Sequence, residues 1–251
     1  MTCYSCGGSG NDGSSSSGGS SSYTPSSSGG SSSRSGGSSS RNRNGYTTYR
    51  FKNGDLYEGY VIDDTPHGQG KFTYADGSSF EGTFVNGYRV KGKMIYKNGD
   101  VYEGEFKNLD RHGKGKMTYK DGRVYEGDWV DGNPHGKGKY TWPGGKKVYE
   151  GDFVNGKQHG KGKLVFSNGT VYTGDFSNNM ACGKGKFVYE NGDVYTGDVD
   201  GEGPDGIGKM IYANGNVYEG EWYGYPYGKG KMTYKNGRVE DGQWENGKFV
   251  G

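Results

Sequence analysis

The sequence repeats itself about every 23 residues over most of its length, and such a period restricts the chain to repeat architectures. The stretch from Val101 to Arg123, VYEGEFKNLDRHGKGKMTYKDGR, represents one unit. Its aromatic second residue recurs in a single column: Tyr57, Phe80, Tyr102, Tyr125, Tyr149, Tyr172, Tyr195 and Tyr218. With 53 glycines and only 29% hydrophobic residues, the chain has too little apolar material for a conventional globular core. Stability is therefore expected to come from contacts between neighbouring units.

Each unit contains two runs in which side chains alternate with period 2, and both are predicted to be half-buried strands. In the representative unit they are Val101 to Phe106 and Lys114 to Tyr119, with a loop between them that holds His112. An Asn-Gly or Asp-Gly pair then joins the second run to the next unit, which indicates a tight hairpin. The chain is therefore expected to form antiparallel hairpins joined in series.

The pairing of side chains selects the register of these hairpins. A three-residue loop with Gly122 in the left-handed region places Met117 opposite Tyr125 and Lys116 opposite Glu126. One face then carries rows of Lys and Glu, and the other carries aromatic rings over glycines. The lysines of this column are Lys71, Lys93, Lys116, Lys139, Lys163, Lys186, Lys209 and Lys231, and their expected partners are Glu81, Glu103, Glu126, Glu150, Thr173, Thr196, Glu219 and Asp241.

The YEGEF start, the HGKGK segment and the aromatic residue before Asn-Gly resemble the MORN repeat (membrane occupation and recognition nexus). The resemblance covers residues 46–251, as about eight units with a half unit at each end. It implies an all-β fold, an elongated single-layer antiparallel β-sheet of stacked hairpins with a shallow aromatic groove. It also implies a scaffold or localisation module, similar to cytoskeletal MORN scaffolds and to radial-spoke head subunits of the ciliary axoneme.

Residues 1–45 differ in composition, because Ser and Gly supply 30 of the 45 positions. Such a segment is predicted to be a disordered tail. It lacks the pattern of a secretory signal, and no stretch has the length of a membrane span, so a cytoplasmic protein is expected. Cys3 and Cys6 form one Cys-x-x-Cys pair, too little for a structural zinc site. They are interpreted either as sites of S-acylation or as ordinary reduced thiols.

Neither an enzyme nor a metal or cofactor site is predicted. The histidines occupy one repeat position, roughly 9 to 10 Å apart in adjacent units, which is too far for shared zinc coordination. They are His67, His112, His135 and His159, and Cys182 takes the same loop position. The acidic segment Asp198 to Asp205 is spaced like the opening of a calcium loop but lacks the closing Glu, so calcium binding and a degenerate repeat both stay open. No group of nucleophile, base and orienting residue emerges, and the repeats leave no room for a catalytic domain.

Two functions remain from the sequence. The first is a non-catalytic scaffold in a cytoskeletal or ciliary assembly, which binds a partner helix or extended peptide in its aromatic groove. The second is a peripheral membrane module that binds anionic phospholipid with help from the tail cysteines. The array holds 28 basic and 28 acidic residues, which argues against nucleic acid. The open edge of the last strand makes a homodimer plausible. The predicted groove residues are Tyr102, Phe106, Tyr119, Tyr125, Trp129, Trp142, Tyr149, Phe153, Tyr172, Tyr218 and Trp222.

Overall fold

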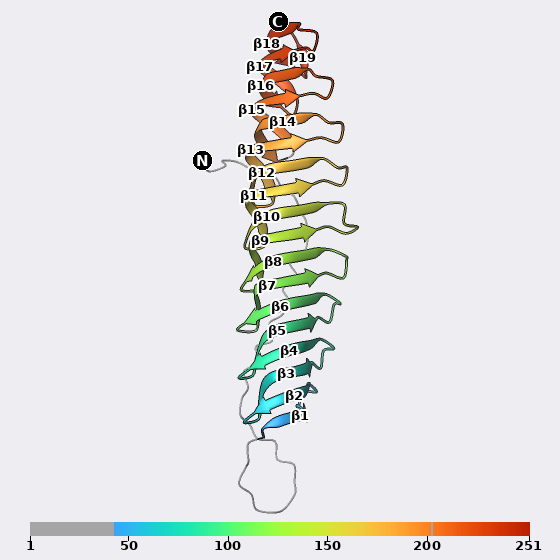
Figure 1. Cartoon of the computed structure of the whole chain (residues 1–251), viewed down its shortest axis with the longest axis vertical. Coiled ribbons are helices and arrows are strands. Elements are labelled where there is room, and N and C mark those ends of the chain that lie inside the picture. The colour runs from blue at the N-terminus through green and yellow to red at the C-terminus, as the bar shows by residue number, and fades with distance from the viewer. Residues whose placement is uncertain (1–42, 202) are drawn as a thin grey trace, which may run out of the picture.

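A computed structural model describes residues 43–201 and 203–251 of the chain. Within these residues the protein is a rod built from one sheet of nineteen strands, with no helix (Figure 1). The strands are β1 Gly45–Arg50, β2 Leu56–Ile62, β3 Thr65–Thr73, β4 Ser79–Val85, β5 Tyr88–Ile95, β6 Val101–Lys107, β7 Asp110–Thr118, β8 Val124–Val130, β9 Asn133–Thr141, β10 Val148–Val154, β11 Lys157–Val165, β12 Val171–Ser177, β13 Met180–Val188, β14 Val194–Gly201, β15 Gly203–Ile211, β16 Val217–Tyr223, β17 Pro226–Thr233, β18 Val239–Glu245 and β19 Lys248–Phe249. At about 4.8 Å per strand the sheet is about 85 Å long before twist.

Every strand pairs antiparallel with the next strand in the sequence, so the sheet is a simple meander. The expected all-β, single-layer antiparallel sheet is confirmed. The predicted register is confirmed as well, because Lys116 lies opposite Glu126 and Met117 opposite Tyr125. At the loop that joins these strands, Gly122 has a φ of 88° and donates its N–H to the carbonyl of Tyr119 at 2.9 Å. We call these Asn-Gly and Asp-Gly loops between units the tips.

The connection inside each unit is shorter than the sequence suggests. Between β6 and β7 only Asn108 and Leu109 form a turn, with φ of 49° and 72°. A two-residue turn with both residues left-handed matches the twist of the strands it joins, and Asn tolerates that conformation. The segment predicted as a loop is therefore strand, and the four histidines lie in β3, β7, β9 and β11. We call these connections the turns.

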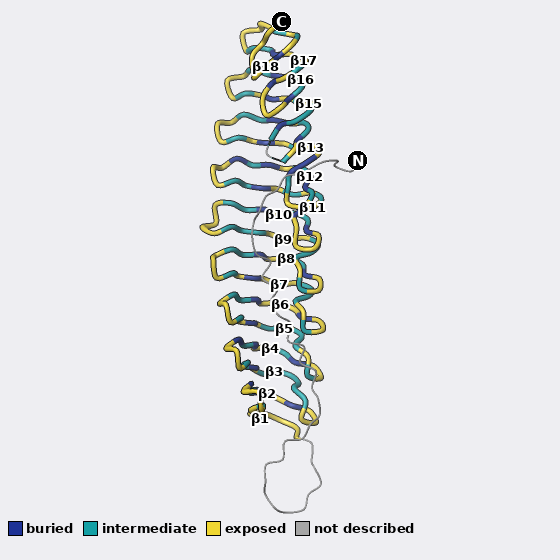
Figure 2. The backbone as a smooth tube through the Cα atoms, turned by 180° about the vertical axis from the view of Figure 1, so that it is seen from behind, coloured by how far each residue is buried: buried dark blue, intermediate teal, exposed yellow. Residues whose placement is uncertain are grey.

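A bulge in each hairpin makes the longer second strand possible. In β6 and β7, Gly104 pairs with Gly115 whereas Glu105 pairs with His112, so two residues of β7 are skipped. One of them, Gly113, has a φ of 63°. Bulges bend a strand, and the hairpins are bent so that the turns and the tips form separate columns along the rod (Figure 2). The surface enclosed by this bend is the inner face, and the opposite surface is the outer face.

The inner face is filled by tyrosine rings that lie over glycine backbone. In the representative unit the Tyr102 ring lies over Gly104 and Gly115, and a Cβ on Gly115 would overlap the ring. Beside the bulge, the Tyr102 hydroxyl donates to the carbonyl of Glu105 at 2.9 Å. The same bond recurs from Tyr57, Tyr125, Tyr149, Tyr172, Tyr195 and Tyr218.

Edge-to-face contacts connect these rings from one unit to the next. Tyr125 packs against Trp129 of its own unit and against Phe153 of the following unit, with ring centroids 5.0 Å apart in both cases. Edge-to-face pairs of this kind contribute beyond the area that they bury. The series is interrupted where valines replace the second ring, at Val61 and Val199, although both are buried. The core is therefore a ladder of rings that is interrupted only where these two valines stand among the described residues.

The two ends of the sheet differ. Among the described residues β1 pairs only with β2, so no described strand covers its other edge. At the opposite end, β18 pairs with β19, and Gln243 donates its N–H to the carbonyl of Gly251 at 2.6 Å and accepts that of Val250 at 2.9 Å. The expectation that the last strand presents a fully unpaired edge is therefore corrected, because the C-terminal residues fold back over half of it. Homodimerisation through this end stays a prediction.

Candidate functional site

Burial corrects the predicted set of groove residues. Nine of the eleven are in the core: Tyr102, Phe106, Tyr125, Trp129, Tyr149, Phe153, Tyr172, Tyr218 and Trp222. Each tyrosine covers bare glycine backbone, and each second ring is wedged between two inner rings, as Trp129 is between Tyr102 and Tyr125, so these rings fill the bend instead of lining an open groove. Only Tyr119 and Trp142 remain partly exposed.

These two belong to a row of nine aromatic residues that runs the length of the rod beside the tips. We call it the tip row: Phe51, Tyr74, Tyr96, Tyr119, Trp142, Phe166, Tyr189, Tyr212 and Tyr234. All nine are partly buried and pack against the core rings, as Phe187 does on Tyr189 at 5.7 Å. The sequence identifies this row completely, since each member directly precedes a tip. What the sequence misses is that the row, and not the inner tyrosines, keeps accessible ring surface.

Cations and hydroxyl groups give the tip row a polar rim. Arg123 stacks on the Tyr119 ring at 4.6 Å, and the Lys147 amine lies 4.5 Å from the centre of the Trp142 ring. Burial raises the pKa of Tyr96 and Tyr119 above the ordinary value, and nearby arginines offset that rise only in part. Their hydroxyls are therefore protonated at neutral pH. The row offers apolar ring faces together with hydrogen-bond donors, which is the usual chemistry of protein-binding surfaces.

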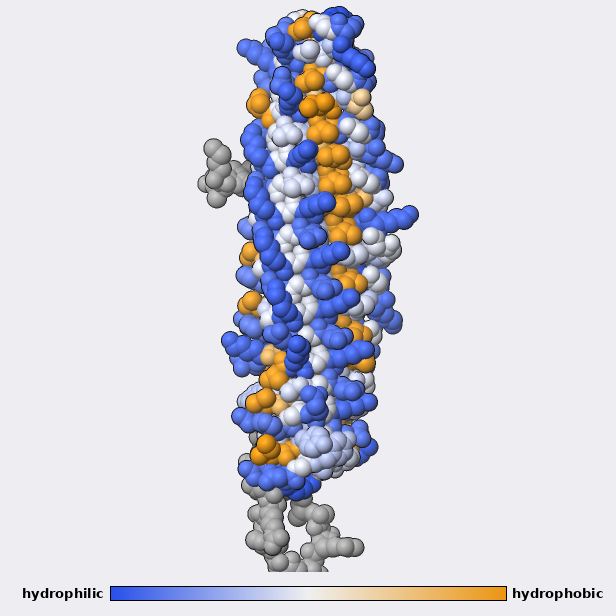
Figure 3. Space-filling model, in the orientation of Figure 1, coloured by the Kyte–Doolittle hydropathy of each residue, from blue (hydrophilic) through white to orange (hydrophobic). Residues whose placement is uncertain are grey.

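Two charged rows and an apolar stripe run along the outer face (Figure 3). In the row predicted from the sequence, ion pairs occur at Lys116 with Glu126 and at Lys209 with Glu219. The second row, on the other side of the glycines, makes shorter pairs: Lys114 with Asp128, Lys137 with Asp152, Lys161 with Asp175 and Lys184 with Asp198. The sequence signal for this row was the first Lys of each Gly-Lys-Gly-Lys segment. The alternation of charges leaves the outer face without a field of one sign.

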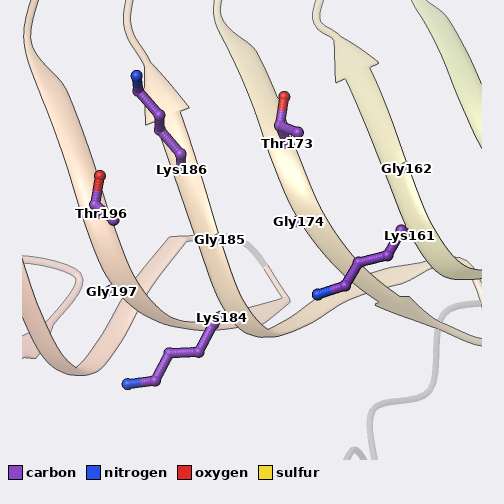
Figure 4. Close-up of a pocket in the computed structure, with 9 residues that line it drawn as sticks. All are labelled: Lys161, Gly162, Thr173, Gly174, Lys184, Gly185, Lys186, Thr196 and Gly197. Atoms are coloured by element: carbon purple, nitrogen blue, oxygen red, sulfur yellow. The ribbon is translucent and has the colours of Figure 1, made fainter.

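A shallow trough of about 400 Å³ lies on the outer face over the glycines of β11 to β14 (Figure 4). Lys161 and Lys184 flank it on one side, and Lys186 flanks it on the other together with two threonines. Lys163 and Lys186 face Thr173 and Thr196, as the sequence predicts. The lysines across the trough are neutralised by Asp175 and Asp198. Lys186 has threonine on both neighbouring strands, whereas Lys163 has Glu150 on its other side, so the positive patch is centred on Lys186.

The remaining candidate residues do not come together as a chemical site. Cys3 and Cys6 lie outside the described residues, so their acylation stays a prediction. Among residues 43–201 and 203–251, no group of three His, Cys, Asp or Glu is placed to hold a metal ion. Asp198 of the acidic segment pairs with Lys184 and accepts the N–H of Ile207 at 2.9 Å. In the same described ranges, no helix is long and apolar enough to span a membrane.

The family of the chain follows from a sequence comparison. The model of the MORN repeat matches residues 57–79, 80–101, 102–122, 125–147, 149–171, 172–194, 204–217 and 241–251. These segments make up more than half of the chain, and the protein belongs to the MORN-repeat family. The resemblance found in the sequence is thus confirmed. No curated protein matches the chain.

Solved structures offer only distant similarity. The TCP domain of SAS-4 (dCPAP) of Drosophila melanogaster, solved with a proline-rich motif of Ana2, is 17% identical, covers 68% of this chain and 87% of its own, and has a TM-score of 0.39. A point mutant of the TCP10 domain of Danio rerio CPAP is 17% identical with a TM-score of 0.41, and the match covers 79% of this chain and 99% of that one. These values are too low to transfer a function.

Proposed function

We propose that the protein is a non-catalytic scaffold that binds a segment of a partner protein along the tip row, within a cytoskeletal or ciliary assembly. The observation that supports it is the continuity of the tip row, in which nine partly exposed rings lie along the same side of the rod. Aromatic side chains are the residues that most often anchor protein interfaces. A rod about 85 Å long presents them in one line, so a helix or extended peptide gains several anchors at once.

The rigidity of the rod supports the same proposal. The core rings fill the bend of every hairpin, so the tip row is held in place before any partner arrives. At the tips, Asp55 accepts the N–H of Ala75 and Asp100 accepts that of Lys120, both at 2.8 Å, and these bonds connect consecutive tips. A preorganised surface loses little entropy on binding.

Substitution of the exposed rings tests the proposal. We expect the triple variant Tyr96→Ala, Tyr119→Ala and Trp142→Ala to lose the proteins that the native chain captures from extracts of cells that express it. The matched control changes the residue before each of these to alanine, at Ile95, Thr118 and Thr141, which the alternation of side chains along a strand places on the outer face. Capture that survives in the triple variant, with both variants shown to be folded by thermal melting, would refute the scaffold function.

Peripheral binding to anionic phospholipid is the second candidate, and the trough beside Lys186 is the observation that favours it. Exposed lysines bind lipid headgroups through charge, so salt screens the interaction. Sedimentation with vesicles that contain phosphatidylinositol phosphates would show binding that disappears at high salt and in a Lys163→Gln, Lys186→Gln variant. Binding through the tip row would be insensitive to both changes.

A further inference from the structure

Two arginines break the repeat pattern on the inner face. One residue near the start of each long strand lies on the inner face opposite the second core ring, as Arg111 does opposite Phe106. In most units this position holds a residue without charge: Pro66, Pro134, Gln158, Ala181, Pro204 and Pro226. Units two and three carry Arg89 and Arg111 instead. Since β5 and β7 are two strands apart, the two arginines are about 10 Å apart along the rod.

Contacts with the core hold Arg89 across the inner face. Its guanidinium lies over the rings of Phe80 and Phe106, 5.6 Å and 5.2 Å from their centres. It donates to the hydroxyl of Tyr74 in the tip row at 3.1 Å and to the carbonyl of Leu109 at 3.1 Å. Its Nε is buried and has no hydrogen-bond partner. The cation is therefore fixed beside the surface that the proposed function assigns to a partner.

Arg111 is held in the same way, one unit further along. Its guanidinium lies 4.6 Å from the centre of the Trp129 ring and donates to the carbonyl of Gly132 at 2.6 Å. Only one of its two terminal nitrogens is used in this bond. Aromatic rings pack against one face of each guanidinium, and such cation–π contacts leave the edges of the planar group free to bind a carboxylate.

No carboxylate of residues 43–201 or 203–251 forms an ion pair with either arginine, although nine pairs of another Lys or Arg with Asp or Glu form in these residues. The acids of the neighbouring tips are already engaged. Asp76 accepts from Ser78, and Asp100 accepts from Asn98 and from the N–H of Lys120. Two partly buried cations without anionic partners leave a positive site on a chain that is otherwise balanced in charge.

We propose that Arg89 and Arg111 bind two carboxylates of an acidic partner segment that lies along the inner face, and so fix the direction in which that partner lies on the rod. This inference rests on the proposed function and specifies the chemistry of the partner. Carboxylates about 10 Å apart are three residues apart in an extended segment or seven apart in a helix. The positions equivalent to Arg89 and Arg111 carry no charge from Pro134 onward, so they contact the less charged part of the partner segment. The acidic end of that segment therefore lies towards β1.

Selection from a phage-displayed library of random peptides tests the inference. The full chain is compared with an Arg89→Gln, Arg111→Gln variant and with a Lys163→Gln, Lys186→Gln variant, which loses the same charge on the outer face. We expect peptides with paired Asp or Glu from the native chain and from the lysine control, and loss of this acidic preference on the arginine variant. Acidic enrichment that persists on the arginine variant, or disappears on the lysine control, overturns the inference.

A second measurement does not depend on the folding of any variant. A selected peptide is resynthesised with its acids changed to amides, and both forms are titrated against the native chain. We expect the amide form to bind about tenfold more weakly or worse, since charged hydrogen bonds are roughly twice as strong as neutral ones. Equal binding of both forms overturns the inference. Acid-poor peptides that need Tyr119 and Trp142 would overturn it but leave the proposed function intact, whereas failure to select any peptide would overturn both.

Discussion

At the scale of the residue, the core tyrosine has two roles in every unit that contains it. Its ring covers two glycines, and its hydroxyl donates to a backbone carbonyl beside the bulge. Unit two shows the converse, because Phe80 stands at this position and has no hydroxyl to donate. There the strand pairing skips a single residue, Val90, instead of two. The hydroxyl and the larger bulge therefore occur together.

Removal of one hydroxyl should measure this bond. In Tyr125→Phe the carbonyl of Asp128 loses its donor, and an unsatisfied buried carbonyl costs about 1 to 3 kcal/mol. We expect the free energy of unfolding in urea to fall by that amount. The control is Tyr46→Phe on the open edge strand, where the ring is 66% exposed and no change is expected. An equal effect of the two substitutions would contradict the assignment.

Alkaline pH should unfold the array through the same residues. Burial raises the pKa of Tyr57 and Tyr218 to about 12, and it raises the pKa of Tyr102, Tyr125 and Tyr149 as well. The unfolded chain loses these protons near pH 10 and the folded chain keeps them, so stability is full below about pH 10 and falls above it, by up to about 1.4 kcal/mol per pH unit for each tyrosine. Urea titrations at a series of pH values would show this slope. A flat profile up to about pH 11 would contradict it.

At the scale of the element, the hairpin is defined by a tip, a turn and a bulge between them. The tip could be predicted because Asn-Gly and Asp-Gly have a known geometry, and apolar pairing then selected the register. The turn could not be predicted, because Asn108-Leu109 is not a typical turn pair. The bulge could not be predicted either, because the sequence around Gly113 does not distinguish a bulge from a loop. The histidines were placed in a loop for this reason. Similarly, alternation predicts which residues face inward but not that Tyr102 would be fully covered by its neighbours.

The aspartates of the second charged row should stabilise the bulges. Asp152 pairs with Lys137 and accepts the N–H of Lys161 at 3.0 Å, and these contacts hold the pKa of its carboxyl below the ordinary value. We expect Asp152→Ala to lower the free energy of unfolding by about 1 to 2 kcal/mol, since both contacts are lost. The control is Glu150→Ala in the first charged row, where the cost should be below about 0.5 kcal/mol. The cost of Asp152→Ala should vanish at a pH low enough to protonate the carboxyl.

At the scale of the whole molecule, stability is shared between neighbours. The rings of each unit pack on those of the next, and turns are connected across units by backbone bonds such as Gly132 N–H to the carbonyl of Arg111 at 3.0 Å. One hairpin alone loses the contacts with both neighbouring units, and isolated hairpins are marginal in water. A peptide of residues 101–123 should therefore show no strand signal in circular dichroism, whereas the full chain does. A folded single unit would contradict the cooperative array.

Where a partner lies on the rod is the central claim, and photo-crosslinking in living cells measures it most directly. Benzoylphenylalanine is placed at Tyr119 or Trp142 in the tip row, and at Lys116 or Lys139 on the outer face. We expect protein adducts from the two tip-row positions and none from the two outer-face positions, because only the tip row offers preorganised ring surface. Adducts that form from Lys116 and Lys139 alone would show that partners bind the outer face, and the proposed scaffold surface would be wrong.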